Sequence, residues 1–168
     1  MNKTGWVWQL AQLAMVLLLT ATPVWAAMGV VQLPAQRGAP EVTVFYPAAG
    51  QNQTLERAGL RVAALPDAPA LAGNGRLIVF SHGSGSTPWA YADLAQQLVA
   101  AGFVVVAPTH PYDHRGNNDQ AGPESWKTRP AEVSQAIDVL ARTPRFAKQL
   151  RLDRVGMYGL SVPVATPH

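Results

Sequence analysis

Short runs of apolar residues recur along the chain and predict β-strands. Residues 77–80 and 103–107 are continuous apolar runs, which is typical of parallel strands that helices cover on both faces. Both runs are too short for a buried helix. Residues 42–46 are rich in β-branched and aromatic side chains and stop at Pro47, which predicts a short edge strand. Residues 154–158 predict another strand, and residues 60–63 are a weaker candidate.

Two stretches instead place apolar residues at the spacing of an amphipathic helix. The first follows Thr87, which can cap a helix, and Pro88, which suits a first helical position, and it ends before Gly102. The second follows Pro130 and stops before Pro144. The apolar positions of the two stripes are Tyr91, Leu94, Ala95, Leu98 and Val99, and then Val133, Ala136, Ile137, Leu140 and Ala141.

Strands and helices therefore alternate along the chain, which predicts an α/β domain with a mainly parallel sheet flanked by helices. Residues 77–107 form a strand, helix, strand unit, and such crossovers are almost always right-handed. No internal repeat and no second domain is visible in the sequence.

The first residues have the features of a signal peptide. Lys3 supplies a positive start, and residues 13–19 form an unbroken apolar run. Pro23 ends any helix begun by this run, and small side chains suit cleavage after Ala26. The run is shorter than the about 18 apolar residues that span a bilayer. We therefore predict that residues 1–26 are removed on export to the periplasm or the medium, with no membrane span left in the mature chain; an uncleaved anchor is the alternative.

Composition narrows the class of protein. The chain has 168 residues, of which 48% are hydrophobic and 14% charged, and these values fit one globular domain. The absence of Cys excludes a disulfide framework. The net charge of +3 and the pI of about 9.6 raise the question of nucleic-acid binding. The basic residues are scattered along the sequence, however, so we interpret them as solvated and expect no nucleic-acid partner.

A glycine-rich loop directly follows the predicted strand 77–80. In residues 80–86 the sequence Phe-Ser-His-Gly-Ser-Gly-Ser would allow backbone N–H groups to turn toward one point, as an oxyanion hole requires. Ligands of open α/β sheets bind at this end of the strands. A dinucleotide-binding loop is the alternative, but the third glycine, the ribose-binding acid and a phosphate-binding lysine are missing.

The second candidate is the sequence Gly159-Leu160-Ser161, which follows the last predicted strand. In the pattern Gly-x-Ser-x-Gly, a sharp turn from strand to helix exposes the serine oxygen for nucleophilic attack. A serine in an ordinary tight turn is the alternative. The position after a strand, together with the upstream His-Gly loop, favours the nucleophile.

Three ordered segments carry a family resemblance. Residues 77–111, 126–133 and 153–161 together resemble the predicted dienelactone hydrolases, α/β-hydrolases related to the platelet-activating-factor acetylhydrolases. The resemblance implies a serine hydrolase that acts on esters, lactones or related small acyl compounds and needs no cofactor. It also implies that Ser161 is the nucleophile and that the backbone N–H groups of Ser84 and Val162 bind the oxyanion.

The end of the sequence departs from this family. The acid and the base of an α/β-hydrolase triad follow the nucleophile in the chain, but only seven residues follow Ser161, and His168 is the sole titratable side chain among them. Pro163 replaces the second glycine of the motif. By this resemblance we therefore expect a chain truncated after the nucleophile, that is, the N-terminal part of an α/β-hydrolase, with residues 27–168 as an incomplete domain.

A change of reading frame explains this departure. One codon set for residues 162–168, read from its third base, encodes Ala-Gly-Gly-His-Thr-Ala and restores Gly-Leu-Ser-Ala-Gly. We therefore hypothesise a frameshift at or just after Ser161. Two functional hypotheses follow, an exported serine hydrolase and a catalytically inactive fragment of one.

Other polar residues near the strand ends suggest weaker hypotheses. His110, Asp113, His114 and Asp119 could ligate a metal, but they lie in a predicted loop without helical spacing. We interpret them as solvated loop residues, with a substrate contact as an alternative, and predict no metal site. Two tryptophans, at positions 89 and 126, are candidates either for lining the cleft or for packing in the core.

Overall fold

The computed structural model describes residues 27–160. The predicted signal peptide, Ser161 and Val162 lie outside these residues. Within residues 27–160, no helix is long and apolar enough to cross a membrane. The strands are β1 Ala27–Leu33, β2 Val42–Ala48, β3 Gln53–Arg57, β4 Leu60–Pro66, β5 Leu77–Ser81, β6 Val104–Pro108 and β7 Val155–Gly159. The helices are the 3-10 helix η1 Pro88–Tyr91 and the α-helices α2 Ala92–Ala100, α3 Pro123–Arg142 and α4 Pro144–Ala147.

These strands form one seven-stranded sheet in the order β3-β4-β1-β2-β6-β5-β7. The predicted α/β fold is confirmed, and one detail is corrected, because the sheet is mixed rather than mainly parallel. Strands β6, β5 and β7 are parallel to one another. The pairs β1–β2, β2–β6 and β3–β4 are antiparallel, and β1 pairs with β4 in parallel. Parallel pairing is thus concentrated where helical crossovers join the strands.

Strand β2 was predicted at a sheet edge, and this prediction is wrong. β2 lies between β1 and β6, and all seven of its residues are buried. The strand also continues through Pro47, which pairs with Met28 of β1. No strand is predicted from the sequence at residues 27–33, although this segment is β1, the strand that pairs with β2 on one side and makes it a central strand.

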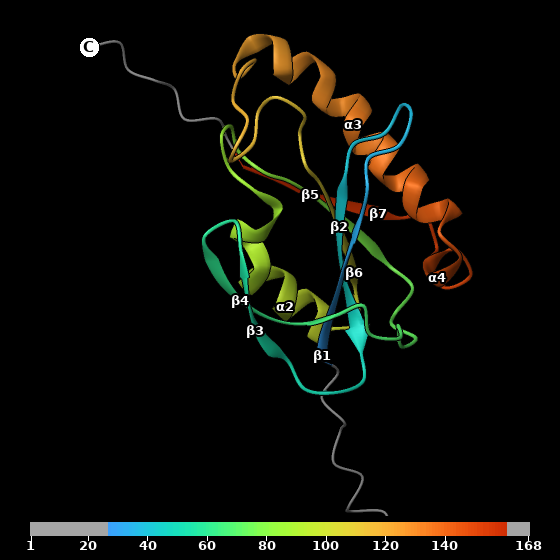
Figure 1. Ribbon diagram of the computed structural model, residues 1–168. Coiled ribbons are helices and arrows are strands. Elements are labelled where there is room, and N and C mark those ends of the chain that lie inside the picture. Colours follow the sequence, from blue (N-terminus) through green and yellow to red (C-terminus); the bar gives the residue numbers. More distant parts are fainter. Residues whose placement is uncertain (1–26, 161–168) are drawn as a thin grey trace, which may run out of the picture.

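Helices cover both faces of the sheet, with α2 on one face and α3 and α4 on the other (Figure 1). Residues of each strand alternate between two hydrophobic clusters because successive side chains point to opposite faces. Val79 and Val106 pack in the cluster under α3, while Phe80 and Val105 pack in the cluster under α2. Ser81 continues the alternation and has the parity of Val79, so its side chain lies on the α3 face.

The first predicted helix has the expected boundaries, divided into η1 and α2. The Thr87 hydroxyl accepts a hydrogen bond from the Trp89 N–H at 3.4 Å, and Pro88 occupies the first turn. Gly102 follows the helix with φ +86°, a conformation that favours glycine.

The second helix begins earlier than predicted. α3 starts at Pro123 and passes through Pro130. A proline inside a helix removes one backbone hydrogen bond. Polar side chains of the first turns, including Ser125, Thr128 and Arg129, bind buried groups elsewhere in the chain or in α3 itself, and these contacts hold the turns in place.

Strand β7 differs from the other strands near it because all five of its residues are exposed. It pairs with β5 on one side and forms one edge of the sheet. Met157 is 64% exposed and Tyr158 is 39% exposed. Among the described residues, β7 therefore forms an exposed sheet edge that carries apolar side chains.

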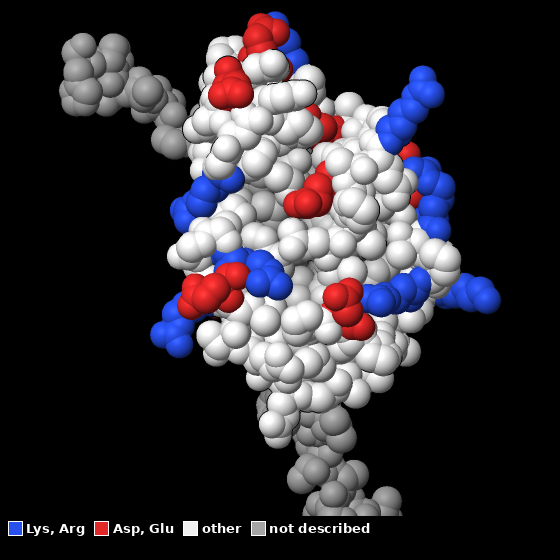
Figure 2. Space-filling view, in the orientation of Figure 1, with Lys and Arg blue, Asp and Glu red and all other residues white. Residues whose placement is uncertain are grey.

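Charged side chains are spread over the surface. Figure 2 shows Lys and Arg side chains on one face of the molecule with Asp and Glu side chains between them. Ion pairs such as Lys127–Glu124 and Arg61–Glu56 lie at exposed positions. On this face the positive charges therefore form no continuous stripe.

Candidate active site at the strand ends

The candidate site is built where the parallel strands β5, β6 and β7 end. Ser81, the last residue of β5, is in register with Gly159, the last residue of β7. The Leu160 N–H donates to the Ser81 carbonyl at 3.3 Å. The residue that follows Leu160 in the sequence is Ser161. The register of two strands thus brings the end of β7 beside the start of the glycine-rich loop.

A buried aspartate holds that loop. One oxygen of Asp113, Oδ1, accepts hydrogen bonds from the Ser84 hydroxyl at 2.5 Å and from the Gly85 N–H at 3.0 Å. Gly85 has φ +65°, which favours glycine at this turn. The Gly85 N–H is therefore committed to Asp113. No acceptor among residues 27–160 binds the backbone N–H of Ser84, the predicted oxyanion donor.

The other oxygen of Asp113 faces α3. Its Oδ2 accepts hydrogen bonds from the Ser125 hydroxyl at 2.6 Å and from Arg129 at 2.7 Å. Burial acts to raise the pKa of Asp113, but the hydrogen bonds from Ser125, Ser84 and Arg129 outweigh it and lower the pKa to about 2. Asp113 is therefore ionised at neutral pH and joins the loop after β5 to helix α3.

His82 is buried as a neutral imidazole. Burial lowers the pKa of His82 to about 4. Its Nδ1 lies 2.9 Å from the Gly83 carbonyl oxygen, and its Nε2 accepts the backbone N–H of His110 at 3.3 Å. The carbonyl of His82 accepts a hydrogen bond from Arg129 at 2.6 Å. Both ring nitrogens therefore have partners, and the histidine ties β5 to the segment that follows β6.

A line of three polar side chains runs beneath the loop. His110 Nε2 lies 2.8 Å from the Ser81 hydroxyl oxygen, and His110 Nδ1 lies 2.6 Å from Glu132 Oε2. The other Glu132 oxygen accepts a hydrogen bond from the Thr128 hydroxyl at 2.7 Å. Ser81, His110 and Glu132 are all buried. Burial acts to raise the pKa of Glu132, but the hydrogen bonds from His110 and Thr128 outweigh it and lower the pKa.

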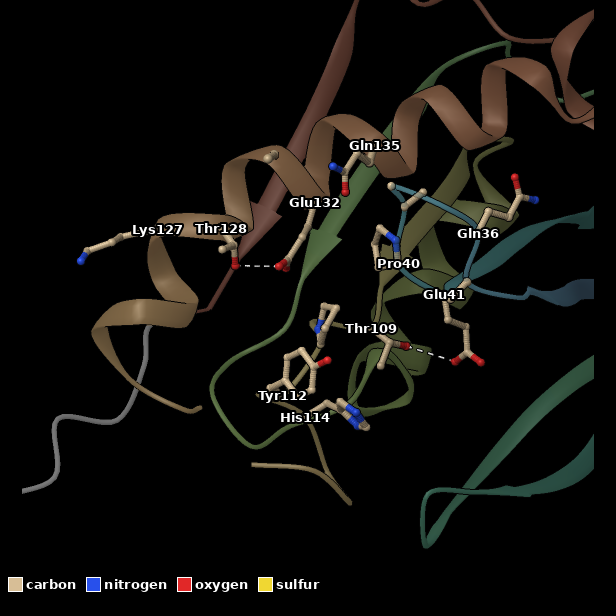
Figure 3. Close-up of a pocket in the computed structure, with 15 residues that line it drawn as sticks. Gln36, Pro40, Glu41, Thr109, Tyr112, His114, Lys127, Thr128, Glu132 and Gln135 are labelled. Carbon is tan, nitrogen blue, oxygen red and sulfur yellow. Dashed lines mark hydrogen bonds between the residues drawn. The ribbon is translucent and has the colours of Figure 1, made fainter. Parts of the chain in front are cut away.

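A pocket of about 810 Å³ lies next to this line of side chains. It is bounded by the loop between β1 and β2, the segment after β6 and the first half of α3 (Figure 3). Glu132 belongs both to the pocket wall and to the buried line. Tyr112 also lines the pocket, is half exposed and has φ +62°, which is uncommon for an aromatic residue. The pocket is therefore lined by the aromatic ring of Tyr112 and by residues of α3.

The structure corrects one prediction at this site. His110 and Asp113 were predicted to be solvated loop residues, and this is wrong, because their exposed fractions are 1% and 0%. Hydrogen bonds hold both side chains in the interior. His110 binds Ser81 of β5 and Glu132 of α3, and Asp113 binds Ser125 and Arg129 of α3. Asp119 is exposed as predicted, and His114 is partly exposed and lines the pocket. Within residues 27–160, no three His, Asp or Glu side chains gather in an arrangement that could hold a metal ion.

The two tryptophans take different positions. Trp89 is buried and packs edge to face against Phe45, with 5.6 Å between the ring centroids. Trp126 is exposed on α3. Neither lines the pocket of about 810 Å³.

Sequence reasoning missed the polar face of α3. Ser125, Thr128, Arg129 and Glu132 follow the spacing i, i+3, i+4 and i+7, so they share one side of the helix. This stripe is a signal present in the sequence, but it lies before Pro130 or close to it, where no helix was expected. With the helix started at Pro123, the stripe predicts a polar network against the strand ends.

Comparisons with known proteins support the fold. No family model matches the sequence, and no curated protein matches it. Among solved structures, the chain is similar to a ferulic acid esterase from Streptomyces cinnamoneus, with a TM-score of 0.58 and 19% sequence identity. The match covers 83% of this chain and 53% of the esterase chain. The chain thus shares an α/β fold with that structure and spans about half of its length.

Proposed function

We propose that the protein is an exported hydrolase of esters, lactones or related acyl compounds, with Ser161 as nucleophile. In this proposal the Ser161 oxygen attacks the substrate carbonyl, an acyl-enzyme forms and water releases the acid. The backbone N–H groups of Ser84 and Val162 stabilise the oxyanion. Export rests on the signal-peptide features of residues 1–26.

One observation carries this proposal, the parallel register of Ser81 with Gly159. Because parallel strands end at the same edge of a sheet, the end of β7 lies beside the loop that begins at His82. A nucleophile elbow and an oxyanion loop need this adjacency to act on one carbonyl group. The hydrogen bonds from Ser84 and Gly85 to Asp113 also support the proposal, because they fix the glycine-rich loop before substrate binds.

The pocket beside α3 suggests a substrate class. Its volume of about 810 Å³ suits a small organic ligand, since such sites measure roughly 300–1,000 Å³. Tyr112 supplies an aromatic surface, and the structural neighbour is a ferulic acid esterase. Esters of aromatic acids are therefore the first substrates to test.

A second candidate function is that of a catalytically inactive fragment of such a hydrolase. The observation that favours it is strand β7, whose five residues are exposed and which has a single partner strand among the described residues. A sheet that ends on an exposed apolar strand is prone to associate with other chains. Resequencing the locus tests the frameshift hypothesis, which requires an open alternative reading frame past Ser161.

Hydrolysis of 4-nitrophenyl acetate and of aromatic acid methyl esters tests the proposal. We expect the full chain to hydrolyse at least one of them, and Ser161→Ala to lower the rate by at least about 10³-fold, as loss of a nucleophile does. Ser134→Ala, an exposed serine of α3, is the matched control and should keep the rate. A wild-type chain with no hydrolysis supports the fragment, and a Ser161→Ala variant with full activity overturns Ser161 as nucleophile.

A further inference from the structure

The buried line Ser81–His110–Glu132 has the connectivity of an acyl-transfer triad. Three elements contribute it, since Ser81 ends β5, His110 follows β6 and Glu132 lies on α3. The distances of 2.8 Å from Ser81 Oγ to His110 Nε2 and of 2.6 Å from His110 Nδ1 to Glu132 Oε2 are hydrogen-bond distances. A hydroxyl, an imidazole and a carboxylate in this order are the parts of a serine nucleophile and its base.

The protons on this line can be assigned from its chemistry. An ionised carboxylate only accepts hydrogen bonds, so Glu132 requires a hydrogen on His110 Nδ1. His110 Nε2 is then the acceptor, and the Ser81 hydroxyl donates to it. This tautomer is the one that can take a proton from a serine as it attacks.

Neighbouring groups hold the imidazole in this orientation. Thr128 donates to the second oxygen of Glu132, and His82 accepts the backbone N–H of His110. The rings of His82 and His110 lie 4.6 Å apart between centroids. His82 and Glu132 are the titratable groups that touch His110, and Arg129 is the nearby cation that acts on both of them. The base is thus positioned before any substrate binds.

Access to Ser81 comes from the side of β7. Ser81 keeps 8% of its surface exposed, and its register partner on β7 is Gly159, which has no side chain. A methyl group added at Gly159 would approach nothing among the described residues more closely than the Ser81 carbonyl oxygen, at 4.0 Å. Met157, two residues before Gly159 and on the same face of the strand, is 64% exposed. Among residues 27–160, no side chain of β7 therefore stands beside Ser81 at this register position.

We propose that Ser81, His110 and Glu132 form a second acyl-accepting site that works independently of Ser161. The Ser81 oxygen bonds to the acyl carbon while its proton moves to His110 Nε2. The protonated imidazole then gives this proton to the departing alkoxide, and the ester C–O bond breaks. Because Ser81 is buried, the acyl group stays on its oxygen, and this site adds nothing to the steady-state hydrolysis that Ser161→Ala removes. With a fluorophosphonate, the Ser81 oxygen bonds to phosphorus, fluoride leaves and the adduct is stable.

Labelling of the full chain with a fluorophosphonate probe tests this site, with the adduct located by peptide mass spectrometry. We expect an adduct on Ser81 in the wild type and in Ser161→Ala, and none at this position in Ser81→Ala. Glu132→Gln should slow the Ser81 adduct by about 10²-fold or more, since it removes the carboxylate that fixes the tautomer. Asp138→Asn, an exposed carboxylate of α3, is the matched control and should leave the labelling rate unchanged.

Mapping in the wild type keeps the test valid even where a variant does not fold, and the thermal transition of each variant reports its folding. An adduct confined to Ser161 overturns the second site while supporting the proposed function. An adduct on Ser81 alone supports the second site and counts against Ser161. A folded chain without any adduct overturns both, and a Ser81 adduct that forms equally fast in Glu132→Gln overturns the triad.

Discussion

Strands β5 and β7 are neighbours that end at the same place, yet their surroundings differ completely. Four of the five β5 residues are buried, whereas all five β7 residues are exposed. β5 has a partner strand on each side, and β7 has β5 alone among the described residues. The segment after β5 is held by Asp113, Arg129 and His110 through buried and partly buried hydrogen bonds.

This contrast separates two parts of the candidate site. The half that follows β5 and β6 is preorganised by its own polar network, because all its buried side-chain polar atoms except Arg129 Nε have hydrogen-bond partners that offset their loss of water. The half that follows β7 depends on a strand that is exposed at all five residues and whose aromatic contacts are those of Tyr158 with Phe80 and Tyr91. The residues of the β5 side should therefore dominate stability, while changes on β7 should affect association more than folding.

The largest effect is expected at Asp113. Asp113→Ala leaves the largely buried Arg129 without its carboxylate, so we expect the free energy of unfolding to fall by about 3–5 kcal/mol. Urea denaturation measures it. Asp138→Ala, at an exposed position of α3, should change it by less than about 0.5 kcal/mol. Equal losses in the two variants would contradict the role assigned to Asp113.

The two strands can be compared directly with one substitution in each. Leu77→Ala removes a fully buried side chain from β5 and should lower the free energy of unfolding by about 2–5 kcal/mol. Met157→Ala acts on an exposed residue of β7 and should change it by less than about 0.5 kcal/mol. Chemical denaturation of both variants under one set of conditions measures the difference. A large loss in Met157→Ala would mean that β7 is covered in solution.

The buried His82 makes stability depend on pH. Its pKa of about 4 lies below the ordinary value of 6.5, so the unfolded chain binds the proton first as the pH falls. The contribution of neutral His82 to the free energy of unfolding is fully present above pH 6.5. As the pH falls toward 4, the free energy of unfolding should decrease by up to ~3 kcal/mol. Thermal unfolding across this range measures it, and His82→Gln should flatten the profile. His114→Gln, at a partly exposed histidine, should leave it unchanged.

The smallest effect on stability is expected at the edge. Met157→Lys should change the free energy of unfolding by less than about 0.5 kcal/mol, yet reduce concentration-dependent association, because charged side chains protect exposed strands. Analytical ultracentrifugation measures the association. Ala100→Lys, at an exposed position of α2, adds the same charge elsewhere and should not reduce it. The same decrease in both variants would assign the effect to net charge instead of to β7.

Much of the fold could be predicted from apolar patterning. The runs at residues 77–80 and 103–107 became β5 and β6, and the stripe through Leu98 and Val99 became α2. β1 and β3 were missed. The sequence of β3, Gln53–Arg57, is polar at most positions, and none of its residues is buried. The segment is a strand because it pairs with β4, and a pairing of this kind leaves no apolar pattern in the sequence.

The sequence by itself determined the alternation of strands and helices and the position of the glycine-rich loop, because hydrophobic period, proline and glycine act over a few neighbouring residues. Only the tertiary structure decided which polar side chains meet. Ser81, His110 and Glu132 are far apart along the chain, and the order of the strands and the start of α3 at Pro123 bring them together. Hydrogen bonding depends on distances of about 3 Å, which local patterns do not encode.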